Sequence, residues 1–417
     1  MRASFPKNFY WGAATSAHQV EGGNTNNWTE WEKANARRLA LETKERFSAL
    51  PMWSRLKGVM RDFQNYISKD ACDHYNRFVG DFDLARSLGH NAHRFSIEWS
   101  RIEPKEGVFD ESEIKHYRAV IAALRERGME PFLTLWHWTL PLWLSEGGGI
   151  LHPKFPEYFE RFAMRAGEAF GGEVKFWITV NEPEIYCLNS YYRGIWPPEG
   201  RGLVAYYRAL SALIAGHRRA YSVLKNGRSN IHVGASLNLS WFESAGGWHD
   251  DFLKMLIDQI WNFHFIKRVR GTIDFIGLNY YFHNRIESGL NKNANERVSD
   301  LGWEIYPEGL YRMLMELKRY QLPIYITENG IADMYDALRA EFIREHIAAM
   351  ERAMKDGVDV RGYFYWSLLD NFEWDKGFWP RFGLIAVDYT IQKRTIRASA
   401  QEYAKIITSH REGLLGP

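Results

Sequence analysis

The sequence contains an almost entirely apolar run, Pro131-Phe132-Leu133-Thr134-Leu135-Trp136-His137-Trp138, with Gly128 just before it. Strands that are buried on both faces have this continuous apolar character, whereas half-exposed strands alternate apolar and polar residues. Seven other runs share it: Phe9–Ala13, Asn91–Glu98, Lys175–Val180, Ile231–Asn238, Ile273–Tyr280, Pro323–Thr327 and Arg361–Leu368. The sequence therefore predicts eight buried strands.

Helix-like segments separate these runs. They are Asp81–Leu88, Ser112–Arg127, Phe155–Phe170, Leu203–Lys225, Pro307–Tyr320 and Leu338–Asp356, and glycines follow several of them where helices are expected to end. Eight strands alternating with helices over 417 residues predict an α/β fold, a single (β/α)8 TIM barrel with enlarged loops at its C-terminal face, and one domain spanning residues 1–417. A doubly wound sheet is the alternative, but no glycine-rich phosphate-binding turn follows the first strand.

Composition and charge exclude several classes of protein. The chain is 46% hydrophobic and 25% charged, as soluble globular proteins are, and its net charge of +2 argues against a nucleic-acid partner. Two cysteines, Cys72 and Cys187, fit a reducing compartment, so we expect a cytoplasmic protein. The opening residues 1–20 contain no apolar core of a secretory signal, and no apolar run reaches the roughly 20 residues of a membrane-spanning helix.

The first connection, from about Asn24 to Lys69, is long and basic. Within it an apolar stripe recurs at helical spacing, formed by Trp53, Leu56, Met60, Phe63 and Ile67. This pattern predicts a helix that packs on the barrel's own surface. Binding of the stripe to a membrane surface or to a partner is the minor alternative, so membrane association is not expected.

Two glutamates directly follow apolar runs at the predicted strand ends. They occur in Thr179-Val180-Asn181-Glu182-Pro183 and in Tyr325-Ile326-Thr327-Glu328-Asn329-Gly330. In a (β/α)8 barrel such positions meet at one face, and two carboxyl groups in one pocket raise each other's pKa. One can then act as an acid while the other stays ionised, as glycoside hydrolysis requires. A single strand-end glutamate is as often a structural ion-pair partner, but the pair favours catalysis.

Motifs along nearly the whole chain resemble those of glycoside hydrolase family 1, the β-glucosidase and β-galactosidase family. The matching strings are residues 9–22 (FYWGAATSAHQVEG), 94–101 (RFSIEWSR), 135–138 (LWHW), 180–183 (VNEP), 278–281 (LNYY), 326–330 (ITENG), 365–374 (YWSLLDNFEW) and 381–383 (RFG). Each string is short, but together and in this order they make a chance similarity very improbable. The fold that the resemblance implies is the predicted barrel.

The resemblance implies a role for each residue of the catalytic centre. Glu182 is expected to be the general acid/base and Glu328 the nucleophile that forms a covalent glycosyl-enzyme, with about 5–5.5 Å between the carboxyl groups. Arg94 and Tyr280 are expected beside the nucleophile, and a buried ion pair without a catalytic duty is the alternative for Arg94.

The resemblance also implies the sugar-binding residues. The expected contacts to sugar hydroxyls are Gln19, His137, Asn181 and Glu373. Asn181 is also expected to support catalysis. The expected aromatic walls are Trp138, Trp366, Trp374 and, on the leaving-group side, Trp303. An isolated tryptophan or histidine in such a sequence more often belongs to the core.

The expected activity is that of a retaining exo-β-glycosidase, a β-glucosidase-type O-glycosyl hydrolase. It would release terminal β-D-glucosyl residues, with β-galactosides and β-fucosides as side substrates, and use neither cofactor nor metal. Glu373 disfavours phosphorylated sugars, and Glu182, where thioglucoside-cleaving relatives have glutamine, favours O-glycosides. The expected partner is a small β-glycoside or oligosaccharide, and a homo-oligomer is left open.

Two other functions are alternatives to this activity. A non-catalytic sugar-binding protein on the same fold would be expected to lack one of the two glutamates. A metal-dependent hydrolase would need clustered ligands at strand ends, and His90, His93 and His116 are poorly spaced for that.

Overall fold

The computed structural model describes residues 5–412. Residues 1–4 and 413–417 lie outside it, and these are the two ends of the predicted domain. The first part of the N-terminal stretch that was expected to contain no secretory signal therefore also lies outside the described residues. Eight parallel strands form a closed barrel in the order β1-β10-β9-β7-β5-β4-β3-β2. Their bounds are β1 Tyr10–Ala14, β2 Ala92–Ser96, β3 Glu130–Trp136, β4 Phe176–Asn181, β5 His232–Asn238, β7 Phe275–Asn279, β9 Ile324–Asn329 and β10 Val360–Trp366. Each overlaps one of the eight predicted runs, so the predicted TIM barrel is confirmed.

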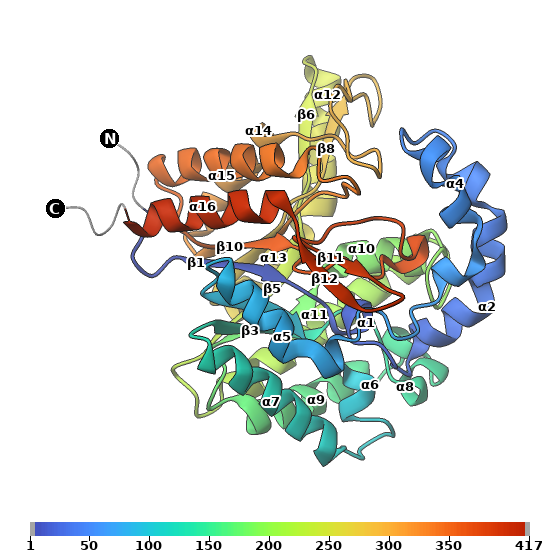
Figure 1. Cartoon of the computed structure of the whole chain (residues 1–417), viewed down its shortest axis with the longest axis vertical. Coiled ribbons are helices and arrows are strands. Elements are labelled where there is room, and N and C mark those ends of the chain that lie inside the picture. Colours follow the sequence, from blue (N-terminus) through green and yellow to red (C-terminus); the bar gives the residue numbers. More distant parts are fainter. Residues whose placement is uncertain (1–4, 413–417) are drawn as a thin grey trace.

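The long helices surround the barrel (Figure 1). They are α5 His74–Ser87, α7 Glu111–Glu126, α9 Phe155–Phe170, α11 Leu203–Lys225, α14 Pro307–Leu317, α15 Arg339–Lys355 and α16 Ala398–Glu412. Helix α7 begins where Asp110 accepts hydrogen bonds from the backbone N–H groups of Ser112 and Glu113, which satisfies donors that a helix start otherwise leaves free. Helix α5 starts seven residues before the predicted segment, and α16 was not predicted.

Shorter elements complete the loops. They are α1 Ala17–Val20, α6 Trp99–Ile102, α8 Leu142–Glu146, η2 Gly149–Leu151, α10 Pro183–Cys187, η3 Leu188–Tyr192, η5 Arg270–Thr272, η6 Lys318–Tyr320, η7 Trp374–Lys376 and the hairpin of β11 Ile385–Asp388 with β12 Lys393–Ile396. A separate two-stranded sheet of β6 Trp241–Ser244 and β8 His283–Ile286 lies beside α12 Trp248–Ile257, η4 Asp258–Asn262 and α13 His264–Val269. Together β6, β8 and α12 protrude from the barrel at the top of Figure 1.

An aromatic cluster fills the barrel near the amino-terminal ends of its strands. The rings of Phe132 and Phe176 stack with centroids 4.2 Å apart, and Tyr325 and Phe364 pack against Phe132. All four side chains are buried. Because side chains fill the interior of such a small barrel, the space for a ligand lies at the other end of the strands.

The long first connection folds as α2 Asn27–Leu41, α3 Thr43–Phe47, α4 Trp53–Arg61 and η1 Phe63–Tyr66. The prediction of one helix carrying the whole apolar stripe is wrong. Helix α4 ends at Arg61 because Asp62 is extended and its side chain accepts a hydrogen bond from the N–H of Gln64, which starts η1. Leu56 and Met60 are nevertheless buried against the rest of the protein, as expected.

Among the helices of residues 5–412, none has both the length and the apolar character needed to cross a membrane.

Candidate active site

A cavity of about 580 Å³ opens at the carboxyl ends of the barrel strands. Ten of the twelve predicted site residues line it, namely Gln19, His137, Trp138, Asn181, Glu182, Trp303, Glu328, Trp366, Glu373 and Trp374. Arg94 and Tyr280 are the two that do not. The barrel thus brings together side chains that are hundreds of positions apart in the sequence.

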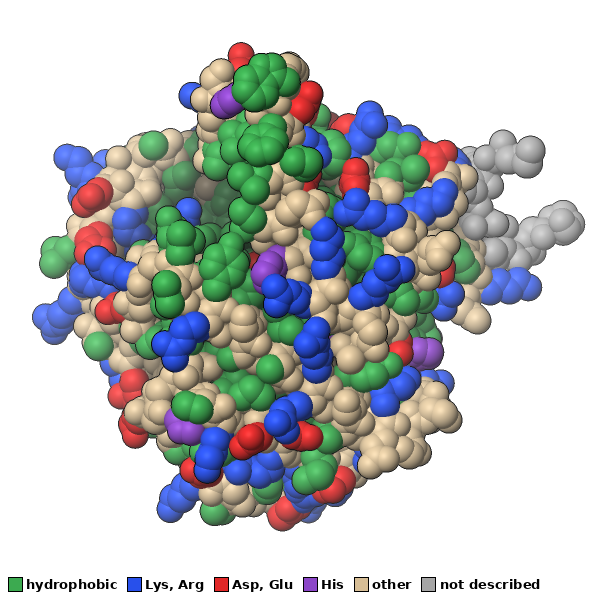
Figure 2. Space-filling model, turned by 180° about the vertical axis from the view of Figure 1, so that it is seen from behind, with side chains coloured by type: hydrophobic (Ala, Val, Ile, Leu, Met, Phe, Trp, Pro, Cys, Tyr) green, Lys and Arg blue, Asp and Glu red, His purple; other side chains and the backbone are tan. Residues whose placement is uncertain are grey.

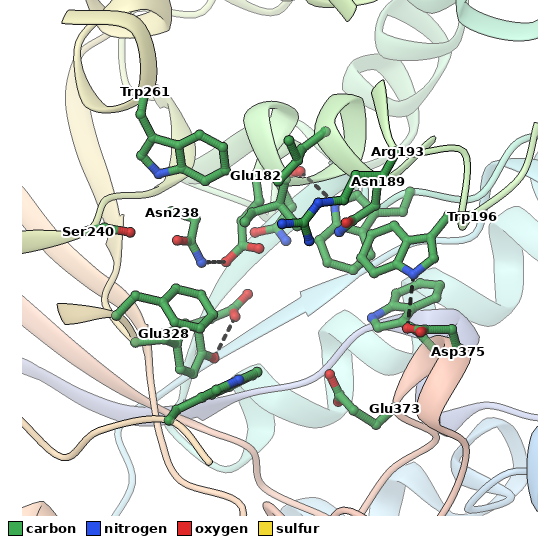
Figure 3. A pocket seen from close by; sticks show the side chains of 18 of the residues that line it. Glu182, Asn189, Arg193, Trp196, Asn238, Ser240, Trp261, Glu328, Glu373 and Asp375 are labelled. Carbon is green, nitrogen blue, oxygen red and sulfur yellow. Dashed lines mark hydrogen bonds between the residues drawn. The ribbon is translucent and has the colours of Figure 1, made fainter. Parts of the chain in front are cut away.

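Glu182 and Glu328 enter the cavity from β4 and β9. Figure 3 shows their carboxylates pointing toward each other across the cavity. Only 5% of Glu182 and 4% of Glu328 is exposed to solvent. Two nearly buried carboxyl groups that share a pocket disfavour each other's ionisation, so one of them tends to keep its proton.

Each carboxylate oxygen of Glu328 has its own donor. Arg94 donates from Nη1 to Oε1 at 2.5 Å, and the hydroxyl of Tyr281 donates to Oε2 at 2.8 Å. Burial raises the pKa of Glu328, while the charge of Arg94 and the hydrogen bond from Tyr281 oppose that rise. These two donors favour the anionic form of Glu328.

Glu182 has amide donors in place of a cation. Its Oε1 accepts hydrogen bonds from Nδ2 of Asn279 at 2.8 Å and from Nδ2 of Asn238 at 3.1 Å. Burial, and then the negative charge of Glu328, raise the pKa of Glu182 to about 8. Glu182 is therefore protonated at neutral pH, as a general acid must be.

The structure corrects the position expected for Tyr280. Its hydroxyl donates to the carbonyl of Tyr306 at 2.9 Å, outside the barrel, and only its backbone N–H bonds to the carbonyl of Glu328. Side chains alternate along a strand, and Asn279 at the end of β7 points inward. The next inward position is Tyr281, which occupies the place beside the carboxylate of Glu328 that was predicted for Tyr280.

Arg94 lies beneath the cavity floor and links several polar groups. Besides Glu328, it donates from Nη2 to Oδ1 of Asn181 at 2.7 Å. The same Oδ1 accepts from Nδ2 of Asn279 at 3.1 Å, and Nδ2 of Asn181 lies 3.2 Å from Nε2 of His137. This network holds Asn181 and His137 in place at the cavity wall.

Three residues at the two glutamates were not predicted from the sequence: Asn238, Asn279 and Tyr281. Asn238 is the last residue of β5, and Asn279 the last of β7. A polar residue at the carboxyl end of a buried strand was the available indication, and the alternation along β7 would have pointed from Asn279 to Tyr281.

Gln19 and Glu373 meet on the opposite wall. The amide of Gln19 donates to the carbonyl of Phe372 at 2.8 Å and to Oε2 of Glu373 at 3.2 Å, while Ser16 donates to Oε1 of Gln19 at 2.7 Å. Burial raises the pKa of Glu373 to about 8, although Lys376 lowers it. Neighbouring amide and carboxyl groups offer both donors and acceptors, which suits the paired hydroxyls of a sugar.

The aromatic wall is held in a strained backbone. Trp138 and Trp374 have φ values of 78° and 51°, and Glu182 has 43°, all in the left-handed region that bulky residues rarely adopt. Trp138 donates from Nε1 to the carbonyl of Asn181 at 2.9 Å, and the ring of His137 stacks against Trp374. Such local strain is typical of functional sites.

The long first connection supports the cavity wall at Asp375. Arg46 of α3 forms an ion pair with the Asp375 carboxylate and donates to its carbonyl at 3.1 Å. Trp196 donates from Nε1 to Oδ1 of Asp375 at 2.9 Å, and both residues line the cavity (Figure 3). Among the described side chains of residues 35–69, which contain none of the matching family strings, Arg46 is the one that forms an ion pair with a cavity-lining carboxylate.

The three histidines of the metal-dependent alternative lie elsewhere in the fold. His90, His93 and His116 do not line the cavity, and His90 and His93 are buried. Burial lowers the pKa of His90 to about 3, as expected for a core histidine.

A (β/α)8 barrel with two opposed, buried glutamates at its carboxyl face is the architecture of a carboxylate-dependent glycoside hydrolase. The sequence matches the model of the family described as Glycosyl hydrolase family 1 over residues 1–267 and 262–412. The chain belongs to this family of O-glycosyl hydrolases.

Known relatives cover almost the whole chain. It is 30% identical to "Beta-glucosidase A" of Thermotoga maritima, over 97% of this chain and 98% of the relative. Among solved structures, a beta-glycosidase from Pyrococcus horikoshii superposes with a TM-score of 0.87 at 34% identity, covering 98% and 96% of the two chains. The Thermotoga maritima beta-glucosidase in complex with glucoimidazole superposes with a TM-score of 0.86 at 29% identity, covering 98% and 99%.

Proposed function

We propose that the protein is a retaining exo-β-glycosidase that releases terminal non-reducing β-D-glucosyl residues, with β-galactosides and β-fucosides as side substrates. The observation that carries this proposal is the unequal pair of buried carboxyl groups. Glu182, with a pKa raised to about 8, is suited to donate a proton, and Glu328, held by Arg94 and Tyr281, is suited to attack as an anion.

In the proposed reaction Glu182 protonates the glycosidic oxygen while a carboxylate oxygen of Glu328 attacks the anomeric carbon. The aglycone leaves and a covalent glycosyl-enzyme forms with inverted configuration. The ester at Glu328 is neutral, so the electrostatic cause of the raised pKa of Glu182 disappears. Glu182 then takes a proton from water, which attacks the same carbon and restores the β configuration.

The glycone is proposed to bind between the polar wall of Gln19 and Glu373 and the indoles of Trp366 and Trp374. An indole face packs well on the axial C–H groups of a β-pyranose, and hydroxyls left unpaired in a dry pocket cost about 1–3 kcal/mol each. A β-glucosidase name and a bound glucoimidazole among the relatives support glucose as the sugar.

Initial rates on nitrophenyl β-glycosides test this assignment. We expect turnover of the β-glucoside, weaker turnover of the β-galactoside and β-fucoside, and very little of the 6-phospho-β-glucoside, whose phosphate meets a like charge whenever Glu373 is ionised. Cello-oligosaccharides should lose glucose from the non-reducing end only. The absence of turnover on every unphosphorylated β-glycoside would overturn the proposal and favour the non-catalytic sugar-binding alternative.

A further inference from the structure

Exposed large apolar side chains concentrate in two segments at the rim of the cavity. Among the described residues eighteen such side chains are exposed, and ten of them lie within residues 192–207 and 248–260. The first segment contributes Tyr192, Ile195, Leu203, Val204 and Tyr207, and the second Trp248, Phe252, Met255, Leu256 and Ile260. We call these ten residues the rim surface. Single exposed apolar residues need no explanation, but a contiguous group at a site does.

The two segments are linked through helix α13, which contacts both α11 and η4, and both segments reach the cavity. The ring of Tyr207 lies 5.8 Å from that of His264, at the start of α13, and α11 packs on α13. Ile195 from the first segment and Ile257 from the second line the cavity, as does Trp261, which directly follows the second segment. In Figure 2 hydrophobic side chains run from the tip of the protruding part down the middle of this face, beside a hollow.

Helix α12 differs from an ordinary surface helix in the apolar side chains that it exposes. Asp250 is buried and accepts a hydrogen bond from the N–H of Ser288, and Asp258, where η4 begins, is buried and pairs with Lys254, whereas Asp251 is exposed. Its apolar side chains face outward, with Trp248 83% and Phe252 55% exposed. Surface helices normally bury their apolar face, so the sequence here is built to present apolar groups outward.

Three arginines without a partner lie beside the apolar residues of the first segment. Arg193, Arg201 and Arg208 form no salt bridge and no side-chain hydrogen bond with any residue in the range 5–412. Arg208 lines a shallow hollow together with Leu203, Val204 and Tyr207. The one acidic residue within 192–211, Glu199, is already engaged by Trp31 and Arg38, and within 248–260 only Asp251 is both acidic and exposed, so the three arginines outnumber the exposed acidic groups. Arginines without a partner, placed among exposed apolar side chains, are complementary to a surface that has negative charges above an apolar interior.

We propose that the rim surface docks on a lipid bilayer that contains anionic lipids, with the mouth of the cavity at the membrane surface. Aromatic side chains favour the headgroup region, arginines attract anionic headgroups and extend toward them, and aliphatic side chains enter the acyl boundary. No membrane association was expected from the sequence, in which the stripe at 53–67 was the one candidate for membrane-surface binding. If the proposed function holds, glycosides with a lipid aglycone reach the cavity directly from the bilayer.

Co-sedimentation with vesicles tests the docking. The full-length protein is mixed with phosphatidylcholine vesicles, with or without 30% phosphatidylglycerol, at low and high salt. We expect binding to the anionic vesicles, weakened by salt because screening reduces charge attraction. Binding to neither kind of vesicle overturns the proposal.

Two double variants locate the surface. Phe252→Ser with Met255→Ser removes apolar contact, and Arg201→Glu with Arg208→Glu reverses charge. Each arginine near an anionic membrane contributes roughly fivefold to partitioning, so we expect at least about a 20-fold loss for the charge reversal. The matched control is Leu41→Ser with Val59→Ser, which changes exposed apolar residues on α2 and α4 and should bind as the unaltered protein does.

Three further readouts separate the alternatives. None of the four substituted positions, 201, 208, 252 and 255, lines the cavity, so turnover of a soluble nitrophenyl β-glucoside verifies that the variants are folded. Equal vesicle binding by the rim and control variants overturns the proposal. A dimer in analytical ultracentrifugation that the rim variants dissociate, without vesicle binding, shows instead that a second copy of the chain covers the surface. Vesicle binding without glycosidase activity retains the docking and refutes the proposed function.

Discussion

The hydroxyl of Tyr281 lies 2.8 Å from Oε2 of Glu328 and donates a hydrogen bond to it, on the side of the carboxylate away from Arg94. The preceding tyrosine, Tyr280, makes its own hydrogen bond to the carbonyl of Tyr306. Two adjacent tyrosines thus have separate environments, because the chain alternates its side chains as it leaves β7. The pair provides a matched test of what holds the proposed nucleophile.

Replacing Tyr281 by phenylalanine should lower kcat/KM for an aryl β-glucoside roughly 10- to 100-fold. A hydrogen bond to a charged group contributes about 1.5–3 kcal/mol, and the lost donor leaves the Glu328 carboxylate less firmly held as an anion. The Tyr280→Phe variant removes the same atom from the neighbouring residue and should reduce kcat/KM only slightly. Equal losses in the two variants would contradict the role given to Tyr281.

The barrel could be predicted from the sequence because its strands are buried on both faces. Runs such as residues 131–138 are then apolar at nearly every position, and all eight overlap observed strands. The two glutamates at strand ends could be predicted for a related reason, since burying a charged side chain directly after an apolar strand costs free energy unless the charge has a partner or a function. Both observations depend only on local sequence.

The features that were missed depend on the packing of distant segments. Asn238 contacts Glu182 only because β5 lies beside β4 in the closed barrel. The orientation of α12 was not predicted, because an apolar stripe on a helix looks the same whether it faces the core or the solvent. Helix α4 ends at Arg61, although the apolar spacing continues to Ile67. The backbone N–H of Gln64 donates to the side chain of Asp62, and this local contact ends the helix.

Replacing Glu328 by alanine should reduce hydrolysis of an aryl β-glucoside to the background rate, because no group remains to attack the anomeric carbon. Added azide or formate is small enough to occupy the vacated space, and it should restore turnover with an α-configured product after a single inversion. Product configuration is measured by proton NMR. Activity that survives the substitution without an added anion would remove the nucleophile assignment.

Replacing Glu182 by alanine should cost far less on substrates with activated leaving groups than on unactivated ones. A dinitrophenolate leaves without protonation, whereas an alkyl alcohol does not. Azide should then intercept the glycosyl-enzyme and give a β-configured product, the opposite of the Glu328→Ala result. A loss of equal size on both kinds of substrate would contradict the acid role.

The pH profile of kcat/KM should be bell-shaped, with its alkaline limb near pH 8. Glu182 must be protonated to act as an acid, and its pKa is raised to about 8, so activity falls as the pH rises through that value. On the acidic side activity falls as Glu328 gains a proton. Because the two carboxyl groups interact, the apparent pKa of each limb is a property of the pair and not of one residue. Steady-state rates between pH 4 and 10 test this.

The Glu182→Gln variant is the control for the pH profile. Glutamine carries no titrating proton, so hydrolysis of an activated dinitrophenyl glucoside by this variant should lack the limb near pH 8. Activity of the unaltered protein that increases from pH 8 to 10 would show that another group provides the proton.

The stereochemistry of the first product tests the central claim most directly, because it reports whether the two glutamates act in succession on one carbon. Proton NMR recorded within the first turnovers of a nitrophenyl β-glucoside, before mutarotation, distinguishes the anomers of the released glucose. The account predicts that the β anomer appears first and the α anomer only later at the mutarotation rate. Initial release of α-glucose would contradict it, since that outcome requires a single direct displacement by water.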